Sequence, residues 1–154
     1  AGNTRGNCRR GRERRVMARF LDTNILLRHL VVEDEEKARA CRELLRRLER
    51  GEETAVTTDV VIFEAVYILE SPRHYGLARN RIRQILEPLI GLRGLRLPSK
   101  SLYTRAFDLF CSTGISFADA YNAAYMEARH LTEVYSYDTD FDRVEGIRRV
   151  EPEA

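Results

Sequence analysis

The sequence predicts an α/β protein in which a parallel sheet of four to five strands is covered by helices on both faces. Short apolar runs of strand length alternate with longer stretches of helical periodicity, a pattern typical of parallel sheets. Neither an internal repeat nor a low-complexity linker interrupts residues 17–152. Because 154 residues are enough to bury a core, we expect a single domain over 17–152.

The individual elements follow from apolar runs and from helix start and stop signals. The helix at 34–51 has acidic residues in its first turn and Gly51 as its stop. The segment 59–71 is apolar nearly all round and too long for a typical buried strand, so we expect a buried helix that ends before Pro72. In chain order the expected elements are strand 19–22, helix 23–30, helix 34–51, strand 54–57, helix 59–71, helix 77–91, strand 94–98, helix 100–114, helix 116–131, strand 133–138 and strand 147–152.

Residues 1–16 have a different composition from the rest of the chain. They hold six arginines and one glutamate, a charge of +5, so with +2 for the whole chain the remainder carries −3. We expect a mostly disordered, Arg-rich tail of upstream or cloning-derived sequence, because this segment has almost nothing to bury. The basicity of the chain therefore says little about its folded part, and a nucleic-acid-binding function has to depend on individual arginines.

The composition argues against membrane-spanning and disulfide-stabilised classes. No apolar run approaches the roughly 20 residues that a spanning helix needs. The three cysteines are odd in number and far apart, which predicts neither a disulfide framework nor a zinc site. We therefore expect a cytoplasmic protein.

Two acidic residues in the first half of the chain occupy unusual positions. Asp22 ends an apolar strand and Asn24 follows it, although Asp22 alone would also suit the N-cap of the next helix. Glu64 lies in the middle of an apolar helix, where an unpaired carboxylate is costly. It is therefore either a neutral or salt-bridged core residue or a cation ligand that faces a cleft.

Two more acidic residues in the second half resemble them. Asp119 follows Ser116 at the spacing of a capping box, but it would also point out of a strand–helix junction. Asp138 ends a strand, so we expect it at the same edge of the sheet as Asp22.

The acidic residues after this last strand alternate along the chain. Asp138, Asp140 and Asp142 have the spacing with which an EF-hand loop begins. An EF-hand is excluded because Arg143 and Arg149 occupy the positions of the required glycine and glutamate. Asp140 is thus either an auxiliary ligand or a turn residue.

Together these residues predict a metal site. Four carboxylates about 6 Å apart repel one another by roughly 3 kcal/mol per pair at an effective dielectric constant near 20, so the cluster needs a cation. Oxygen ligands alone favour Mg²⁺ or Mn²⁺ over zinc. We therefore predict metal-dependent hydrolysis of phosphodiester bonds, with Asp22, Glu64, Asp119 and Asp138 as the ligands. The sequence contains neither a serine–histidine nucleophile motif nor a glycine-rich phosphate loop that would favour another chemistry.

Four stretches of the chain resemble the motifs of PIN-domain nucleases, and most closely those of VapC-type toxins from toxin–antitoxin pairs. They are RFLDTNILLRHL, VIFEAVYIL, FADAYNAAY and YSYDTDFDRVEGI, which occur in family order within residues 17–152. The resemblance implies a Rossmann-like PIN fold and an endoribonuclease activity that depends on Mg²⁺ or Mn²⁺. It also implies a homodimer and inhibition by a VapB-like antitoxin.

The resemblance further implies roles for individual residues. The catalytic metal ligands are the same four acidic residues, with Asp140 as an auxiliary ligand. Residues expected to position them are Thr23, Asn24 and Ser136. Contacts to RNA are expected from Arg28 and Arg143, with Arg81 and Arg83 as further candidates, and an ordinary solvated arginine is the alternative for each.

Two helices contain more apolar residues than the burial of one helix face requires, and the extra residues predict surfaces that bind a partner. They lie on the first helix and on the helix of Glu64: Ile25, Leu26, Tyr67, Ile68 and Leu69. Such residues suit an antitoxin segment or a dimer contact, and burial in the core is the alternative for each.

Three other functions compete with the toxin. A housekeeping PIN nuclease would use the same acidic residues, and a PIN-like binding module would have lost catalysis. A phosphatase of the haloacid dehalogenase type needs a second aspartate two residues after the first, where this chain has Asn24.

Overall fold

The computed structural model describes residues 18–30 and 34–153. All the expected strands and helices are present in the expected order, and the Arg-rich tail at 1–16 lies outside the described residues. Two short 3₁₀ segments add to them. The bounds are β1 Arg19–Phe20, α1 Thr23–Arg28, α2 Glu35–Arg50, β2 Ala55–Val56, α3 Asp59–Glu70, α4 Arg79–Ile90, β3 Leu95–Arg96, η1 Lys100–Leu102, α5 Tyr103–Thr113, α6 Phe117–Ala128, β4 Glu133–Tyr135, η2 Thr139–Arg143 and β5 Arg148–Val150.

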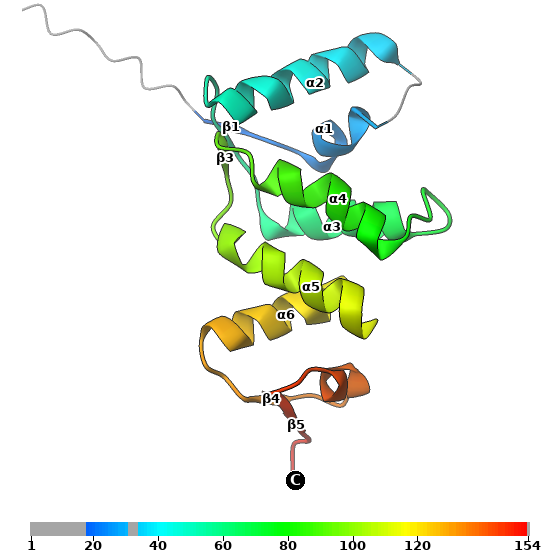
Figure 1. The fold of residues 1–154 in the computed structure, drawn as a ribbon, viewed down its shortest axis with the longest axis vertical. Coiled ribbons are helices and arrows are strands. Elements are labelled where there is room, and N and C mark those ends of the chain that lie inside the picture. The colour runs from blue at the N-terminus through cyan, green and yellow to red at the C-terminus, as the bar shows by residue number, and fades with distance from the viewer. Residues whose placement is uncertain (1–17, 31–33, 154) are drawn as a thin grey trace, which may run out of the picture.

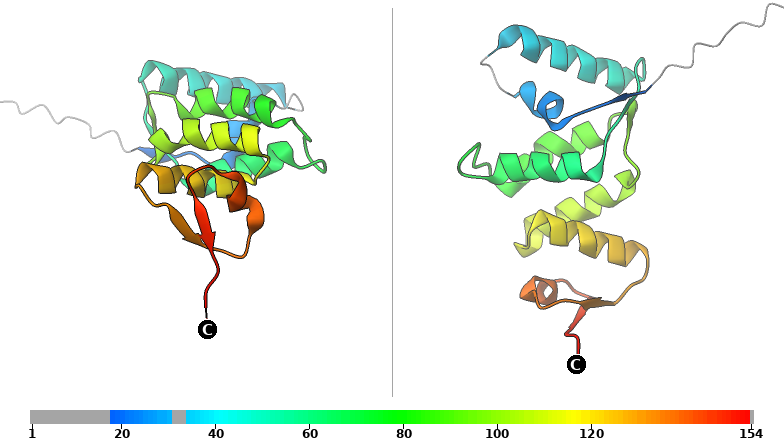
Figure 2. Two further views of the ribbon diagram at one scale, coloured as in Figure 1. Left: turned by 60° about the horizontal axis from the view of Figure 1, so that its bottom comes forward. Right: turned by 180° about the vertical axis from the view of Figure 1, so that it is seen from behind.

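The α/β class with parallel strands is confirmed, but the strands form two sheets and not the single sheet that we expected. One sheet has the order β1-β2-β3 and the other pairs β4 with β5, all in parallel. Along the long axis the first sheet lies next to α2 at one end and the second sheet lies at the other end, with α5 and α6 between the two sheets (Figures 1 and 2). Apolar runs predict where strands occur, whereas the pairing of their edges depends on how the intervening helices pack, which periodicity does not encode.

The first sheet fixes the exit of β1. The register pairs Arg19 with Ala55 and Ala55 with Leu95. Beyond the strand, Leu21 N–H donates to the carbonyl of Val56 at 2.8 Å, and the fully buried Thr57 hydroxyl donates to the carbonyl of Leu21 at 2.9 Å. Because these bonds hold the chain up to Leu21, the side chains that follow emerge from a defined point.

Helix α2 confirms its predicted boundaries. The Asp34 side chain accepts a hydrogen bond from Lys37 N–H at 3.0 Å, as an N-cap does. Gly51 ends the helix in the left-handed region, with φ of +72°. The buried stripe repeats at helical spacing and consists of Ala38, Cys41, Leu45 and Leu48.

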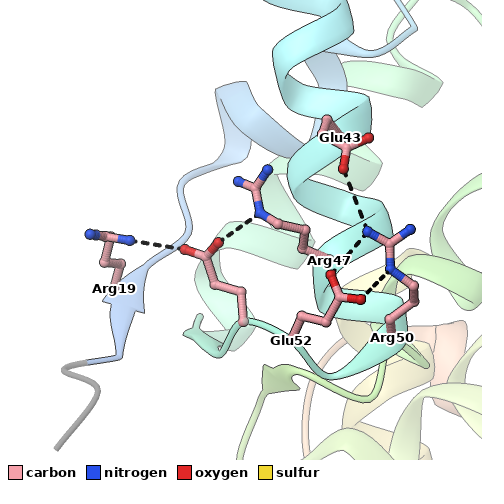
Figure 3. Close-up of polar contacts among 6 residues, drawn as sticks. Arg19, Glu43, Arg47, Arg50 and Glu52 are labelled. Carbon is pink, nitrogen blue, oxygen red and sulfur yellow. Dashed lines mark hydrogen bonds and ion pairs between the residues drawn. The ribbon is translucent and has the colours of Figure 1, made fainter. Parts of the chain in front are cut away.

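Ion pairs attach the end of α2 to the first strand. Glu53 accepts from Arg19 of β1 at 2.9 Å and from Arg47 of α2 at 3.1 Å. Its pKa is lowered mainly by the hydrogen bond from Arg47. Figure 3 shows this contact beside that of Arg50 with Glu52, 2.8 Å apart. The side chain of Glu53 is 19% exposed, whereas the arginines and Glu52 are exposed by 40–82%, so we expect each pair to contribute little to the stability of the fold.

Helix α3 is less buried than its apolar sequence suggests. One face is buried, and it consists of Val61, Ile62, Ala65, Val66 and Leu69. The opposite face exposes Val60 by 75% and Tyr67 by 66%, with Glu64 between them. The expected helix that is buried all round is therefore wrong, because only one face of α3 meets the core. Glu64 is not a core residue.

A polar contact within the aromatic core ties the start of α3 to the last two long helices. Asp59 accepts from the hydroxyl of Tyr103 at 2.6 Å and from that of Tyr121 at 3.1 Å. Burial, and then the bond to Asp59, raises the pKa of Tyr103. Tyr103 and Phe117 stack at 6.3 Å between ring centroids. The first half of the chain is thereby fixed to the second.

Candidate metal centre

Three aspartates from two segments of the second half come together. Asp119, Asp138 and Asp140 each present a carboxylate oxygen, and these oxygens all lie within 4.8 Å of one another. Asp119 lies in the first turn of α6, Asp138 caps η2, and Asp140 lies in η2. Asp119 and Asp140 are half-buried and Asp138 is exposed, so the group is accessible from solvent on one side.

Local hydrogen bonds explain why the chain places these carboxylates so closely. The hydroxyl of Ser116 accepts from Asp119 N–H at 3.1 Å and donates to the Asp119 carboxylate at 2.5 Å. Asp138 N–H donates to the Ser136 hydroxyl at 2.9 Å, and the Asp138 carboxylate accepts from Asp140 N–H at 2.9 Å. The carboxylates of Asp119 and Asp138 are thus oriented by hydrogen bonds within their own turns.

The capping and ligand interpretations of Asp119 are therefore compatible. Ser116 caps α6, as the spacing predicts, and the same hydroxyl orients the Asp119 carboxylate toward the other two aspartates. The sequence predicts Ser116 only as a cap. The spacing of three residues between Ser116 and Asp119 also indicates that Ser116 can orient the Asp119 carboxylate, once Asp119 is taken as a metal ligand.

The first-half acidic residues lie outside this group. Asp22 is the N-cap residue of α1 by position, but its side chain does not cap the helix and accepts instead from the Asn24 amide at 3.3 Å. The buried hydroxyl of Thr23 donates to the Glu64 carboxylate, which joins α1 to α3. Thr23 and Asn24 thus contact the two acidic residues that they were expected to position. Asp22 and Glu64 are not among the three carboxylates that lie within 4.8 Å of one another, so a shared site with Asp119 and Asp138 stays a prediction.

The three-aspartate group has the chemistry of a site for a hard divalent cation. Carboxylates about 5 Å apart repel by roughly 3 kcal/mol per pair at an effective dielectric constant near 20, so the group is unfavourable without positive charge. Arg143 supplies part of it, with its guanidinium 3.6 Å from Asp140. All ligands on offer are oxygens, which suits Mg²⁺ or Mn²⁺.

The expected RNA-binding arginines differ in their surroundings. Arg143 lies at the rim of the three aspartates. Arg28 lines a cavity together with Asn24. Arg83 pairs with Glu87 at 2.8 Å and with Asp108 at 2.7 Å, so it joins α4 to α5. These two bonds raise the pKa of Arg83, with Glu87 contributing most.

The five apolar residues that were expected to bind a partner differ in how far they are buried. Leu26 and Leu69 are fully buried, and Ile25 and Ile68 pack partly against the core. Tyr67 alone among the five is exposed. Within the described residues, no helix is both long and apolar enough to cross a membrane.

Comparison with known proteins adds a family assignment to this geometry. A model of the family described as PIN domain matches residues 19–147, which span β1 to the residue before β5. That range contains both acidic groups. No curated protein matches the chain.

Proposed function

The chain belongs to the PIN domain family, whose members are generally metal-dependent nucleases. We propose that it is an endoribonuclease that uses Mg²⁺ or Mn²⁺. We propose further that it is the toxin of a type II toxin–antitoxin pair. The nuclease proposal is supported by the proximity of the carboxylates of Asp119, Asp138 and Asp140. Such a cluster on this fold favours hydrolysis of a phosphodiester.

The residues of the site divide the work between them. Asp119, Asp138 and Asp140 would hold the ion, and Ser116 and Ser136 fix the turns that carry them. A divalent ion there supplies positive charge for a phosphodiester and lowers the pKa of water. Arg143, at the rim, is placed to meet a phosphate of the RNA.

Asp22 and Glu64 belong to the proposal as further ligands or as residues that position the substrate. Their hydrogen bonds come from neutral donors, Asn24 and Thr23, which leave the negative charge of each carboxylate in place. Both acidic residues are exposed at the surface. They are therefore available to a cation that enters with the substrate.

The toxin role is supported by the motifs that resemble VapC-type proteins. It includes a homodimer and a VapB-like antitoxin as partners. The exposed apolar side chains of α3, Val60 and Tyr67, are available to such a partner. A small DNA-binding protein encoded immediately upstream would support this role, and its absence would favour a housekeeping nuclease.

Cleavage of labelled RNA tests the nuclease directly. We expect the parent chain to cut RNA with Mg²⁺ or Mn²⁺, to be inactive in EDTA, and to lose activity on Asp119→Asn. Equal cleavage by parent and variant, or cleavage that EDTA does not affect, would refute the proposal. A chain that binds RNA without cutting it would be a binding module, and release of phosphate from small phosphoesters would indicate a phosphatase.

A further inference from the structure

A cavity of about 560 Å³ lies beside the Asp22 side of the molecule and is not explained by metal binding. Its walls come from α1, from the start of α2, and from α3 with the turn that follows it. Asn24 lines this cavity and donates to Asp22, so the cavity and the acidic residue are neighbours.

The lining combines positive charge with an aromatic ring. Arg28, Lys37 and His74 contribute nitrogen-bearing side chains, and Tyr75 contributes a ring that is 39% exposed. Lys37 is paired with Asp34 at 2.8 Å, so its charge is largely compensated. No ion pair joins Arg28 to a residue in 18–30 or 34–153, although the carboxylate-bearing Asp34 lines the same cavity.

The wall that carries Tyr75 is held by backbone hydrogen bonds. The carbonyl of Ser71 accepts from His74 N–H and from Gly76 N–H, each at 2.9 Å. Leu77 N–H donates to the carbonyl of Leu69 at 2.8 Å, which closes the turn onto α3. Gly76 has a φ of +58°, a conformation that glycine adopts without strain. The ring and His74 are therefore presented by a defined turn.

We propose that this cavity binds a flanking nucleotide of single-stranded RNA, with the base stacked on Tyr75 and a phosphate at Arg28. The inference depends on the proposed nuclease function, since it names a contact for the same substrate. Aromatic stacking combined with arginine contacts is how proteins hold unpaired bases and their phosphates. The cavity is large enough for a nucleotide. Because Asn24 lines the cavity and also contacts Asp22, an RNA strand bound in the cavity would run on past Asp22.

A peptide is the other occupant to consider, and the lining favours RNA. Ile68 supplies apolar surface, but Arg28 contributes a guanidinium and His74 an imidazole to the lining. Positive charge beside an exposed ring is complementary to a phosphate–base unit. A peptide occupant would leave RNA binding unaffected by changes in the cavity.

The test is binding of a fluorescent single-stranded oligoribonucleotide to the full chain, measured by anisotropy in EDTA. We expect Tyr75→Ala to weaken binding by about 5- to 150-fold, the loss of one stacked base. Tyr75→Phe should bind like the parent because it keeps the ring. The matched control is Tyr125→Ala, which removes another tyrosine that is 39% exposed but that lies on α6 away from the cavity.

A second arm tests the phosphate contact. Arg28→Gln should reduce the slope of log K against log salt by about 0.7, as expected for one phosphate contact on a single strand. Arg46→Gln, an exposed arginine of α2, should leave the slope unchanged. Circular dichroism of each variant confirms that the fold is retained.

The outcomes separate this inference from the nuclease proposal. Binding by Tyr75→Ala and Arg28→Gln that equals the parent, or an equal loss in Tyr125→Ala, would overturn the cavity assignment. A parent that binds RNA through the cavity but cuts none with Mg²⁺ or Mn²⁺ would contradict the nuclease and leave the cavity assignment standing. Cleavage of the oligonucleotide in EDTA would also count against the nuclease proposal alone.

Discussion

The two acidic groups of this protein differ in what surrounds them. Asp22 and Glu64 each accept a hydrogen bond from a neutral side chain, Asn24 and Thr23 respectively. Asp119, Asp138 and Asp140 face one another, and Arg143 at 3.6 Å is the cation nearest to Asp140 among the recorded ion pairs of the described chain. Asp119 and Asp138 also accept from neutral donors, the Ser116 hydroxyl and Asp140 N–H. The difference is that carboxylates within 4.8 Å of one another repel and therefore require positive charge.

Because of this difference, we propose different roles in catalysis for the two groups of acidic residues. The second group holds the ion in our proposal, and the first group contacts the substrate or completes the coordination when substrate is bound. Asp59 connects them structurally, because it fixes the start of α3 to α5 and α6. The predictions that follow test whether the groups are unequal and whether this connection matters.

The largest expected effect is the loss of RNA cleavage when Asp138 is replaced. We expect Asp138→Asn to reduce the rate of RNA cleavage by on the order of 100-fold or more, because the loss of a ligand charge removes several kcal/mol of stabilisation. Asp142→Asn is the matched control, since Asp142 lies in the same acidic stretch but outside the group, 3.3 Å from Arg149. An equal loss in both variants would contradict the site, because it would reflect the charge of the segment and not the cluster.

A smaller effect is expected for Glu64. We expect Glu64→Gln to reduce cleavage by roughly 10- to 100-fold, the range seen when a residue supports a metal site from outside it. Steady-state kinetics with Mn²⁺ measure this effect against that of Asp138→Asn. If Glu64→Gln proves as damaging as Asp138→Asn, the two groups act as one site and the comparison fails.

The connection between the groups is tested by unfolding. Asp59→Asn replaces a carboxylate that accepts from two tyrosine hydroxyls, so we expect the free energy of unfolding to fall by about 1–3 kcal/mol. Urea denaturation followed by circular dichroism measures it. Tyr121→Phe removes only the longer of the two bonds and should cost less; a larger cost than that of Asp59→Asn would count against this arrangement.

The smallest predicted effect is a pH dependence at the end of α1. Burial lowers the pKa of His29, and Arg42 lowers it further. The unfolded chain therefore binds a proton more readily than the folded chain, and stability falls as the pH drops below about 6.5, toward the lowered pKa of the folded state. We expect His29→Gln to flatten the curve of thermal midpoint against pH below about 6.5. A curve identical to that of the parent would show that His29 does not contribute.

The sequence predicted the elements well because local signals determine them. Asp34 and Gly51 bound α2 as expected, and the Ser116 cap opens α6. Asp138 and Asp140 lie within one turn of the chain, so their proximity follows from local geometry. What local signals did not predict is the division of the strands between two sheets, because strand pairing is a tertiary contact that periodicity does not encode.

The position of Glu64 shows the same limit at the level of one residue. An apolar segment indicated a helix buried all round, yet Val60, Glu64 and Tyr67 share an exposed face. Composition gives the average burial of a helix, whereas the neighbours of each face depend on tertiary packing. The expected meeting of four carboxylates depends on such packing too, and it stays a prediction: of the four, Asp119 and Asp138 are in the three-aspartate group.

Binding of Mn²⁺ to the full chain, measured by isothermal titration calorimetry, tests the metal centre most directly. We predict that the parent and Asp142→Asn bind Mn²⁺ equally well and that Asp140→Asn binds it at least about tenfold more weakly, since a carboxylate ligand is lost. Mn²⁺ affinity that is the same in Asp140→Asn as in the parent would contradict the assignment of the ion to the three aspartates.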